Sequence, residues 1–179
     1  MNTFSDPKKI IDQCTINAGQ HIADFGAGTG AYTLAIAEKI QGDIESSIFA
    51  VDVQKDLLSR LDTEARERHL SGVRVIWGDI ENPSGSRLKT GSIDTVLIAN
   101  TLFQVEDAQQ VLTEAQRVLR PKGQMLVVDW SESFGNIGPA TEDIITESVV
   151  RSRCEDLGFT FEKNIDAGEH HYGLIMRNQ

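Results

Sequence analysis

The sequence predicts an α/β protein built on a doubly wound sheet of seven strands, mostly parallel with one antiparallel strand, and with helices on both faces. Three observations support this class. Short apolar runs alternate with helical segments through most of the 179 residues. A glycine-rich run at residues 24–30 joins the first apolar run to an Ala-rich helical segment. The last two apolar runs follow each other across a short turn, which predicts a terminal hairpin and hence the antiparallel strand.

Strands are expected where short apolar, β-branched runs end at turn-forming or acidic residues. The runs at 95–99 and 124–129 are apolar on both faces, as in the middle of a covered parallel sheet. Ligands of such sheets bind at the carboxyl edge of the strands. The expected strands are 21–25, 47–51, 73–77, 95–99, 124–129, 159–165 and 171–176.

Helix boundaries follow from capping and helix-breaking residues. Asp6 followed by Pro7 is typical of a helix start. Asp107 is expected to cap a later helix, and residues 120–123, which contain a proline and a glycine, are expected to end it. The expected helices are 6–14, 31–40, 54–70, 107–119 and 146–158.

Acidic residues lie at or just after the ends of the first three expected strands, at the edge where a ligand is expected. Asp24 opens the glycine-rich run, Asp52 ends the second strand and Asp79 follows the third. The glycines let the backbone turn tightly and approach a ligand, and the next helix offers unpaired N–H groups. Three carboxylates around such a loop indicate a ligand that carries hydroxyl groups, an amine and positive charge.

The glycine pattern alone also fits the loop of dinucleotide-binding proteins, and Asp24 is the residue that separates the two readings. A carboxylate about 5 Å from a pyrophosphate, at an effective dielectric constant near 20, costs roughly 3 kcal/mol. That cost weakens binding about a hundredfold. A ligand with a cationic sulfonium and ammonium group is instead attracted.

Four segments, in order, resemble the class I S-adenosylmethionine-dependent methyltransferases of the small, quinone-methylase-like kind. They are 24–30, 50–53, 77–80, and 92–100 followed by 118–124, within roughly residues 20 to 130. The resemblance implies a Rossmann-like methyltransferase fold with S-adenosylmethionine as cofactor and S-adenosylhomocysteine as product. It also implies methyl transfer by direct displacement to a small-molecule acceptor.

The resemblance assigns Asp24, Gly26 and Gly28 to the first cofactor motif, Asp52 to the ribose and Asp79 to the adenine amine. Capping of a helix by Asp52 and formation of a turn by Asp79 are the alternatives. The backbone of Gly78 or Ile80 is expected beside the adenine, and Asn100 follows the fourth strand, where this fold presents side chains to the methionine part. The full expected cofactor-binding set is Asp24, Phe25, Gly26, Ala27, Gly28, Thr29, Gly30, Asp52, Val53, Gly78, Asp79, Ile80 and Asn100.

On the acceptor side, Phe4, Phe103 and Trp130 are the expected contacts, and the polar segment 131–145 is expected to be mobile over the crevice. Phe103 is an equally good core residue, and Trp130 could simply cover the sheet edge. The catalytic residue is left open, because displacement at a methyl group needs a base only when the acceptor loses a proton. His171 and Tyr172 are weak candidates for that role, with a structural histidine as the alternative.

Composition sets further limits. The formal net charge of −10 argues against nucleic acid as the acceptor and leaves small molecules or a protein. Cys14 and Cys154 are the two cysteines and lie far apart, so no metal site is expected. Without an 18-residue apolar run or a secretory signal pattern, the chain is expected to be cytoplasmic and not inserted in a membrane.

The length suits a single methyltransferase domain over 1–179. Its expected parts are an N-terminal helix and cover (1–18), a cofactor-binding core (19–130), the mobile segment (131–145) and a helix with the terminal hairpin (146–179). Two other functions stay open at this point. One is a cofactor-binding module without turnover. The other is an NAD-dependent oxidoreductase. Against this function, the sequence has no obvious Tyr-x-x-x-Lys catalytic pair. The oligomeric state is not predicted.

Overall fold

The strands form one seven-stranded sheet in a computed structural model that describes residues 5–135 and 137–179. The strands are β1 (His21–Phe25), β2 (Ser47–Asp52), β3 (Val73–Trp77), β4 (Ile93–Ala99), β5 (Leu119–Trp130), β6 (Thr160–Ile165) and β7 (His171–Arg177). Their order is β3-β2-β1-β4-β5-β7-β6. Strands β1 to β5 pair in parallel, and β7 runs antiparallel to both β5 and β6. The predicted doubly wound sheet with one antiparallel strand is therefore confirmed.

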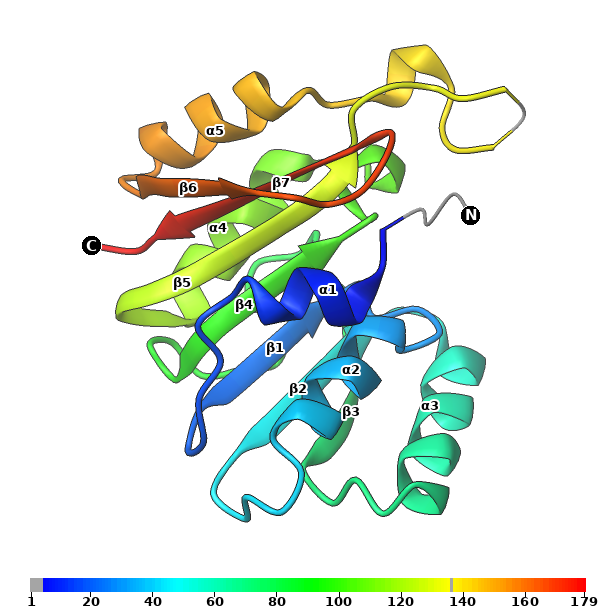
Figure 1. Cartoon of the computed structure of the whole chain (residues 1–179). Coiled ribbons are helices and arrows are strands. Elements are labelled where there is room, and N and C mark those ends of the chain that lie inside the picture. Colours follow the sequence, from blue (N-terminus) through cyan, green and yellow to red (C-terminus); the bar gives the residue numbers. More distant parts are fainter. Residues whose placement is uncertain (1–4, 136) are drawn as a thin grey trace.

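Helices cover both faces of this sheet (Figure 1). One face packs against α1 (Pro7–Asp12), α2 (Ala31–Lys39) and α3 (Lys55–Glu67), and the other against α4 (Ala108–Val118) and α5 (Glu147–Asp156). Side chains alternate between the two layers: Ala23 and Phe25 face α4, whereas Ile22 faces α1 and α2. Asp24 therefore points toward the α2 side.

Predicted capping residues begin two of the helices, α1 and α4. The Asp6 carboxylate accepts a hydrogen bond from the backbone N–H of Lys8 at 3.0 Å, with Pro7 in the first turn of α1. Asp107 accepts one from the backbone N–H of Gln110 at 3.0 Å. At the other end of the chain, Gly158 follows α5 with φ +93°, a conformation that glycine adopts at least cost.

The start of β5 differs from the prediction. The strand begins at Leu119, directly after α4, because Leu119 pairs with Ile93 before the register shifts to the Thr95–Gln124 pair. Residues 120–123 do end the helix, but they belong to the strand, with Lys122 in the left-handed region at φ +65°. Local sequence signals showed the helix stop but not this long-range pairing.

Residues 131–135 and 137–145 lie beyond the carboxyl end of β5, on the way to α5 (Figure 1). Phe134 and Ile137 form an isolated bridge, and a short 3-10 turn covers Thr141–Asp143. A Cβ on Gly138 would lie 2.8 Å from the ring of Trp130, so the segment packs closely on that indole. The expected mobility of this segment remains a prediction.

Candidate functional site

A cleft of about 190 Å³ opens at the carboxyl ends of β1, β2 and β3. It brings together predicted residues from three separate parts of the chain. Its walls are formed by Gly26, Gly28, Val51, Asp52, Val53, Gln54, Gly78, Asp79, Ile80, Glu81, Thr101, Gln104 and Val105. The cleft lies where parallel α/β sheets bind their ligands.

The glycine loop needs glycine at each of its three positions, for different reasons. Gly26, Gly28 and Gly30 all have positive φ, at +74°, +54° and +82°. A Cβ on Gly26 would lie 2.5 Å from Thr101 Oγ1, and one on Gly30 would lie 2.2 Å from Leu61 Cδ1. A Cβ on Gly28 would meet no protein atom closer than 3.9 Å, so the space in front of Gly28 is open to the cleft.

Asp52 ties the glycine loop to the turn after β2. Its Oδ2 accepts a hydrogen bond from the Gly28 backbone N–H at 2.8 Å, and its Oδ1 accepts one from the Gln54 N–H at 2.7 Å. The side chain is 8% exposed and lines the cleft. Each carboxylate oxygen has further lone pairs, so the group can also accept bonds from ligand hydroxyls.

Asp79 shapes the turn that closes the far side of the cleft. Its Oδ1 accepts a bond from the Glu81 backbone N–H at 3.0 Å, and its Oδ2 accepts one from Asn82 Nδ2 at 2.6 Å. Gly78 permits a close approach there, because a Cβ would lie 2.5 Å from the carbonyl oxygen of Gly85. Asp79 thus forms a turn, as its alternative reading expected, and still lines the cleft.

Asp24 is deeper than expected. Its side chain is 2% exposed and is not part of the cleft wall. Instead its Oδ2 accepts a hydrogen bond from Thr33 Oγ1 on α2 at 2.6 Å. Burial raises the pKa of the Asp24 carboxyl to about 6, opposed by the Thr33 hydrogen bonds and assisted by the charge of Asp52. The predicted direct contact of Asp24 with a ligand in the cleft is therefore not supported by its position, because the side chain lies behind the glycine loop.

The remaining loop residues lie around this core. Phe25 is fully buried under α4. The Ala27 N–H, like that of Gly26, donates to the Val51 carbonyl, and Thr29 faces a depression beside α1. Gly30 begins α2 without any side chain to cap it. These residues shape and support the loop, and within the loop only Gly26 and Gly28 line the cleft.

Asn100, at the end of β4, has an unusual environment. Its backbone is left-handed at φ +53°, and its carbonyl oxygen accepts a bond from Gln104 Nε2 at 2.9 Å. Its side-chain Oδ1 is buried without a hydrogen-bond partner. A buried unpaired acceptor of this kind is costly, which makes it a natural contact for a donor group on a ligand. Asn100 is not itself among the residues that line the cleft.

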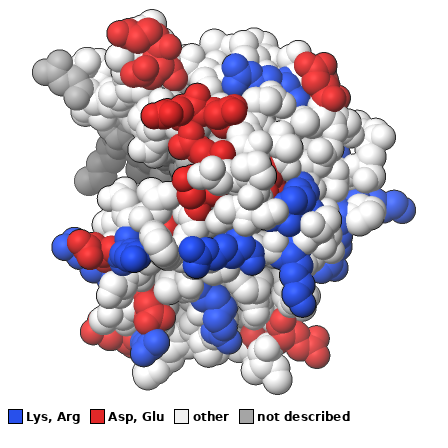
Figure 2. All heavy atoms as spheres, turned by 180° about the vertical axis from the view of Figure 1, so that it is seen from behind, with Lys and Arg blue, Asp and Glu red and all other residues white. Residues whose placement is uncertain are grey.

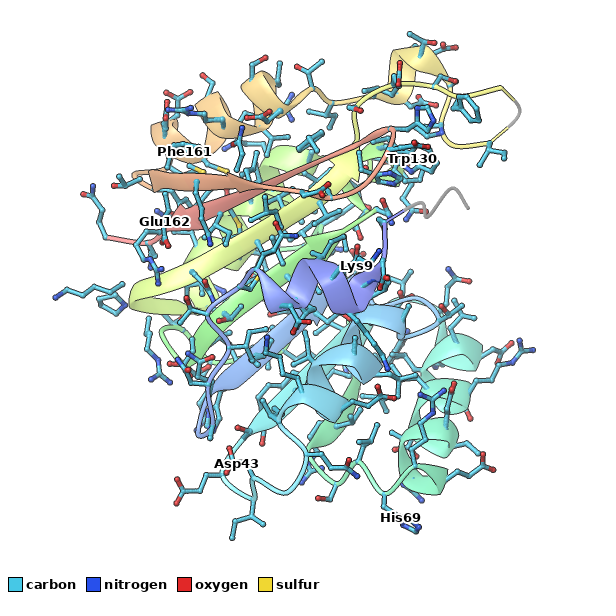
Figure 3. The ribbon with its side chains drawn as sticks, viewed as in Figure 1. Lys9, Asp43, His69, Trp130, Phe161 and Glu162 are labelled. Atoms are coloured by element: carbon cyan, nitrogen blue, oxygen red, sulfur yellow. The ribbon has the colours of Figure 1, made fainter. Side chains whose placement is uncertain are left out.

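Trp130 and His171 lie beside each other farther along the same sheet edge. They are opposite residues in the β5–β7 pair, and their ring centroids are 4.3 Å apart. Figure 3 shows Trp130 at the end of β5, where residues 131–145 leave the sheet, while His69 lies at the opposite end of the molecule. Neither Trp130 nor His171 lines the cleft described above.

The His171 ring is held in one tautomer. Its Nδ1 lies 3.0 Å from the carbonyl oxygen of Glu169, which can only accept, so Nδ1 carries the proton and Nε2 is left as an acceptor. Burial lowers the pKa of His171, so the ring is neutral near pH 7. The neighbouring His170 contacts other groups: its Nδ1 lies 2.7 Å from Glu132, and its ring stacks on Phe134.

Tyr172 and Phe103 have mainly structural surroundings. The Tyr172 phenol is buried and donates a hydrogen bond to the Ile145 carbonyl at 3.0 Å, and burial raises its pKa. Phe103 is half-buried in the 3-10 turn Leu102–Gln104, away from the cleft wall. The expected contact Phe4 lies outside the described residues.

A sequence profile described as a methyltransferase domain matches residues 16–171, which is most of the chain. The chain belongs to this family. Among curated relatives, the demethylmenaquinone methyltransferases of Geobacillus sp. and Lactobacillus johnsonii are 28% and 29% identical over 122 and 127 residues. These alignments cover 68% and 70% of this chain but 50% of each relative, so the chain spans about half the length of these relatives.

Solved structures agree on the fold of this methyltransferase domain. A SAM-dependent methyltransferase from Aquifex aeolicus has a TM-score of 0.86 at 22% identity, covering 98% of this chain and 91% of that one. A putative type 11 methyltransferase from Sulfolobus solfataricus has a TM-score of 0.75 at 22% identity, with 99% and 95% covered. The [4+2]-cyclase SpnF has the same fold, with a TM-score of 0.80 at 16% identity, and 96% and 80% covered.

Several cleft residues of the methyltransferase domain escaped the sequence analysis. Thr101 packs so closely on the glycine loop that a Cβ on Gly26 would clash with it. The Thr101 hydroxyl donates to the Phe25 carbonyl at 3.2 Å. Gln104 and Glu81 also line the cleft. Glu81 holds the loop before α4 by accepting bonds from the N–H groups of Glu106 and Asp107. The sequence signal that could have identified these residues is their position: Thr101 and Gln104 closely follow Asn100, and Glu81 closely follows Asp79.

In residues 5–135 and 137–179, no group of side chains could hold a metal ion, and no helix is long and apolar enough to span a bilayer. Three acids line the cleft, Asp52, Asp79 and Glu81, and Asp24 is buried behind the glycine loop. Asp24, Asp52, Asp79 and Glu81 take part in none of the ion pairs between described residues. These four carboxylates therefore have no basic side chain of the described residues within 4 Å.

Proposed function

We propose that this chain is an S-adenosylmethionine-dependent methyltransferase that acts on a small molecule. The observation that supports this best is the cleft, in which an open glycine loop meets acids that have no cationic partner in the described part of the chain. Family membership and the relatives named as demethylmenaquinone methyltransferases agree with it. A quinol-like acceptor is accordingly the first compound to test.

The residues present fit the cofactor. Gly28 leaves space that a Cβ would fill, and its neighbour Asp52 has free lone pairs for the ribose hydroxyls. Asp79, with the backbone of Gly78 and Ile80, would hold the adenine end. The unpaired Oδ1 of Asn100 is an acceptor for an ammonium group. When bound, the cofactor supplies a methyl group on a cationic sulfur.

The charge of the site favours this ligand over a dinucleotide. Asp24 is buried, with no cation paired to it among the described residues, and the Asp52 charge is near enough to raise the Asp24 pKa. A pyrophosphate would add further negative charge, whereas a sulfonium and an ammonium group reduce the repulsion. The protein's own contribution to transfer is then to hold the donor and acceptor in line and to exclude water.

The acceptor is expected beyond Asn100, toward Trp130 and His171. His171 Nε2 is the one described group there that the contacts identify as a neutral acceptor, so it is the candidate base if the acceptor must lose a proton. The face shown in Figure 2 carries acidic and basic side chains interspersed, with several basic ones across its middle. This mixed surface supports a small-molecule acceptor rather than a nucleic acid.

Calorimetric titration tests the cofactor, and a labelling assay tests the transfer. We expect S-adenosylmethionine and S-adenosylhomocysteine to bind and NAD to show no heat. Incubation with labelled donor and a reduced naphthoquinone lacking the methyl group, or a cell extract, should then give a labelled small molecule. Binding without any labelled product would favour a module without turnover, and the cyclase neighbour shows that this fold carries other activities.

A further inference from the structure

Thr33 has a contact that the cofactor cleft alone does not explain. It is fully buried on the first turn of α2 and does not line the cleft. Its hydroxyl donates to Oδ2 of Asp24 at 2.6 Å. Gly30, which begins α2, has no side chain to cap the helix. The Thr33 hydroxyl therefore joins the first turn of α2 to the Asp24 carboxylate on β1.

Within residues 5–135 and 137–179, the groups that face Asp24 from the elements packed against it carry no positive charge. Ala50 of β2 and Leu97 of β4 are its register partners, and Thr33 faces it from α2. Two titratable groups are coupled to Asp24: the charge of Asp52 raises the pKa of Asp24, and the charge of Asp24 raises the pKa of Tyr32. A buried carboxylate in such surroundings takes up a proton unless hydrogen-bond donors hold it ionised.

The Thr33 donors oppose the protonation of Asp24. Both the hydroxyl and the N–H of Thr33 lower the pKa of Asp24, against the larger effect of burial. The N–H belongs to the helix backbone and is present in any variant, but the hydroxyl is specific to threonine or serine. The ionised fraction of Asp24 near neutral pH therefore depends on one side-chain hydroxyl.

We propose that Thr33 is a positioning residue of the cofactor site, whose hydroxyl holds Asp24 in the orientation and charge state that attract the cationic methyl donor. This inference rests on the proposed function, because it needs a cationic ligand. It assigns Thr33 no contact with the ligand. Asp24 acts on the donor by charge through the loop, and Thr33 acts on Asp24.

The experiment uses Thr33→Val, which removes the hydroxyl at nearly constant volume, and Thr33→Ser, which restores it. Thr113→Val is the matched control, because Thr113 also bonds through its hydroxyl from a helix, to Gln109 of α4 on the other face of the sheet. For each protein, the dissociation constant of S-adenosylmethionine is measured by calorimetry from pH 5.5 to 8.5. The free energy of unfolding without ligand is measured over the same range.

We expect Thr33→Val to weaken donor binding about tenfold near pH 6.5, with the loss shrinking toward pH 8.5. The midpoint of its pH profile should lie above that of the wild type, in binding and in unfolding alike. Thr33→Ser and Thr113→Val should follow the wild type. The donor's own amine titrates identically in every variant, so it does not affect the comparison.

A Thr33→Val protein that remains folded and keeps the wild-type pH profile would overturn the inference, and so would failure of Thr33→Ser to restore that profile. Failure of the proposed function gives a different result. In that case the wild type itself binds no S-adenosylmethionine at any pH, and the role of Thr33 toward that ligand falls with it. The unfolding profiles still show whether the hydroxyl controls Asp24.

Discussion

The backbone N–H of Gly28 donates to Oδ2 of Asp52 across 2.8 Å, and this bond joins the glycine loop to the end of the neighbouring strand. The residue expected to hold the ribose is thus also a support of the loop. One substitution at Asp52 therefore changes both the ligand contacts and the shape of the site.

For Asp52→Ala we expect binding of S-adenosylmethionine to weaken at least about tenfold, because charge-assisted bonds to ribose hydroxyls contribute roughly 1.5–3 kcal/mol each. Two backbone N–H groups also lose their acceptor, so the free energy of unfolding should fall by about 1–2 kcal/mol. Calorimetry and urea denaturation measure the two effects. Asp56→Ala, at an exposed site on α3, is the control. Unchanged affinity in Asp52→Ala would remove Asp52 from the site.

Gly28→Ala should block the ligand more than it harms the fold. The new Cβ meets no protein atom closer than 3.9 Å, yet it fills the open space in front of the loop. Gly91→Ala is a matched control, because Gly91 has a similar φ of +65° and nothing within 4 Å. Both variants should lose about 1 kcal/mol of stability, and only Gly28→Ala should lose donor binding. Equal binding by the two variants would contradict the proposed position of the ligand.

The stability of the ligand-free protein should fall as pH rises, through the contribution of Asp24. Its pKa is raised from 3.8 to about 6 in the folded state, so the folded protein holds a proton that the unfolded chain releases. The stabilisation is complete below pH 4 and is lost through pH 6, and its size is on the order of 2–3 kcal/mol. Asp24→Asn should flatten this part of the profile in chemical denaturation. A wild-type profile that rises between pH 4 and 6.5, and that the Asp24→Asn substitution leaves unchanged, would contradict the prediction.

Tyr172→Phe should reduce stability without changing cofactor binding. The substitution removes the hydrogen bond from the buried phenol to the Ile145 carbonyl, at a cost of about 0.5–1.5 kcal/mol. Denaturation measures this loss, and calorimetry should give the wild-type affinity for the donor. A marked loss of methyl transfer in a protein of normal stability would instead return Tyr172 to the acceptor side.

Much of the fold could be predicted from the sequence, because the strand and helix signals are local. The capping residues Asp6 and Asp107 begin their helices as expected, and the turn between the last two runs gives the antiparallel β7. The early start of β5 at Leu119 was missed, since it depends on pairing with a residue that is distant in the sequence.

The candidate site was likewise predictable from the sequence only in part. Gly26, Gly28, Asp52 and Asp79 reach one cleft, as their positions after successive parallel strands predict. The depth of Asp24 depends on its partner Thr33 on the next helix, which no spacing rule identifies. Thr101 was missed for a similar reason, because it matters through its close approach to the glycine loop.

The protein's own hydrogen bonds hold the glycine loop: the N–H groups of Gly26 and Ala27 donate to the Val51 carbonyl, that of Gly28 to Asp52 and that of Gly30 to the Ala27 carbonyl. The loop therefore loses its conformational entropy when the chain folds, and not when a ligand binds. The heat-capacity change on ligand binding should therefore contain no contribution from ordering of this loop.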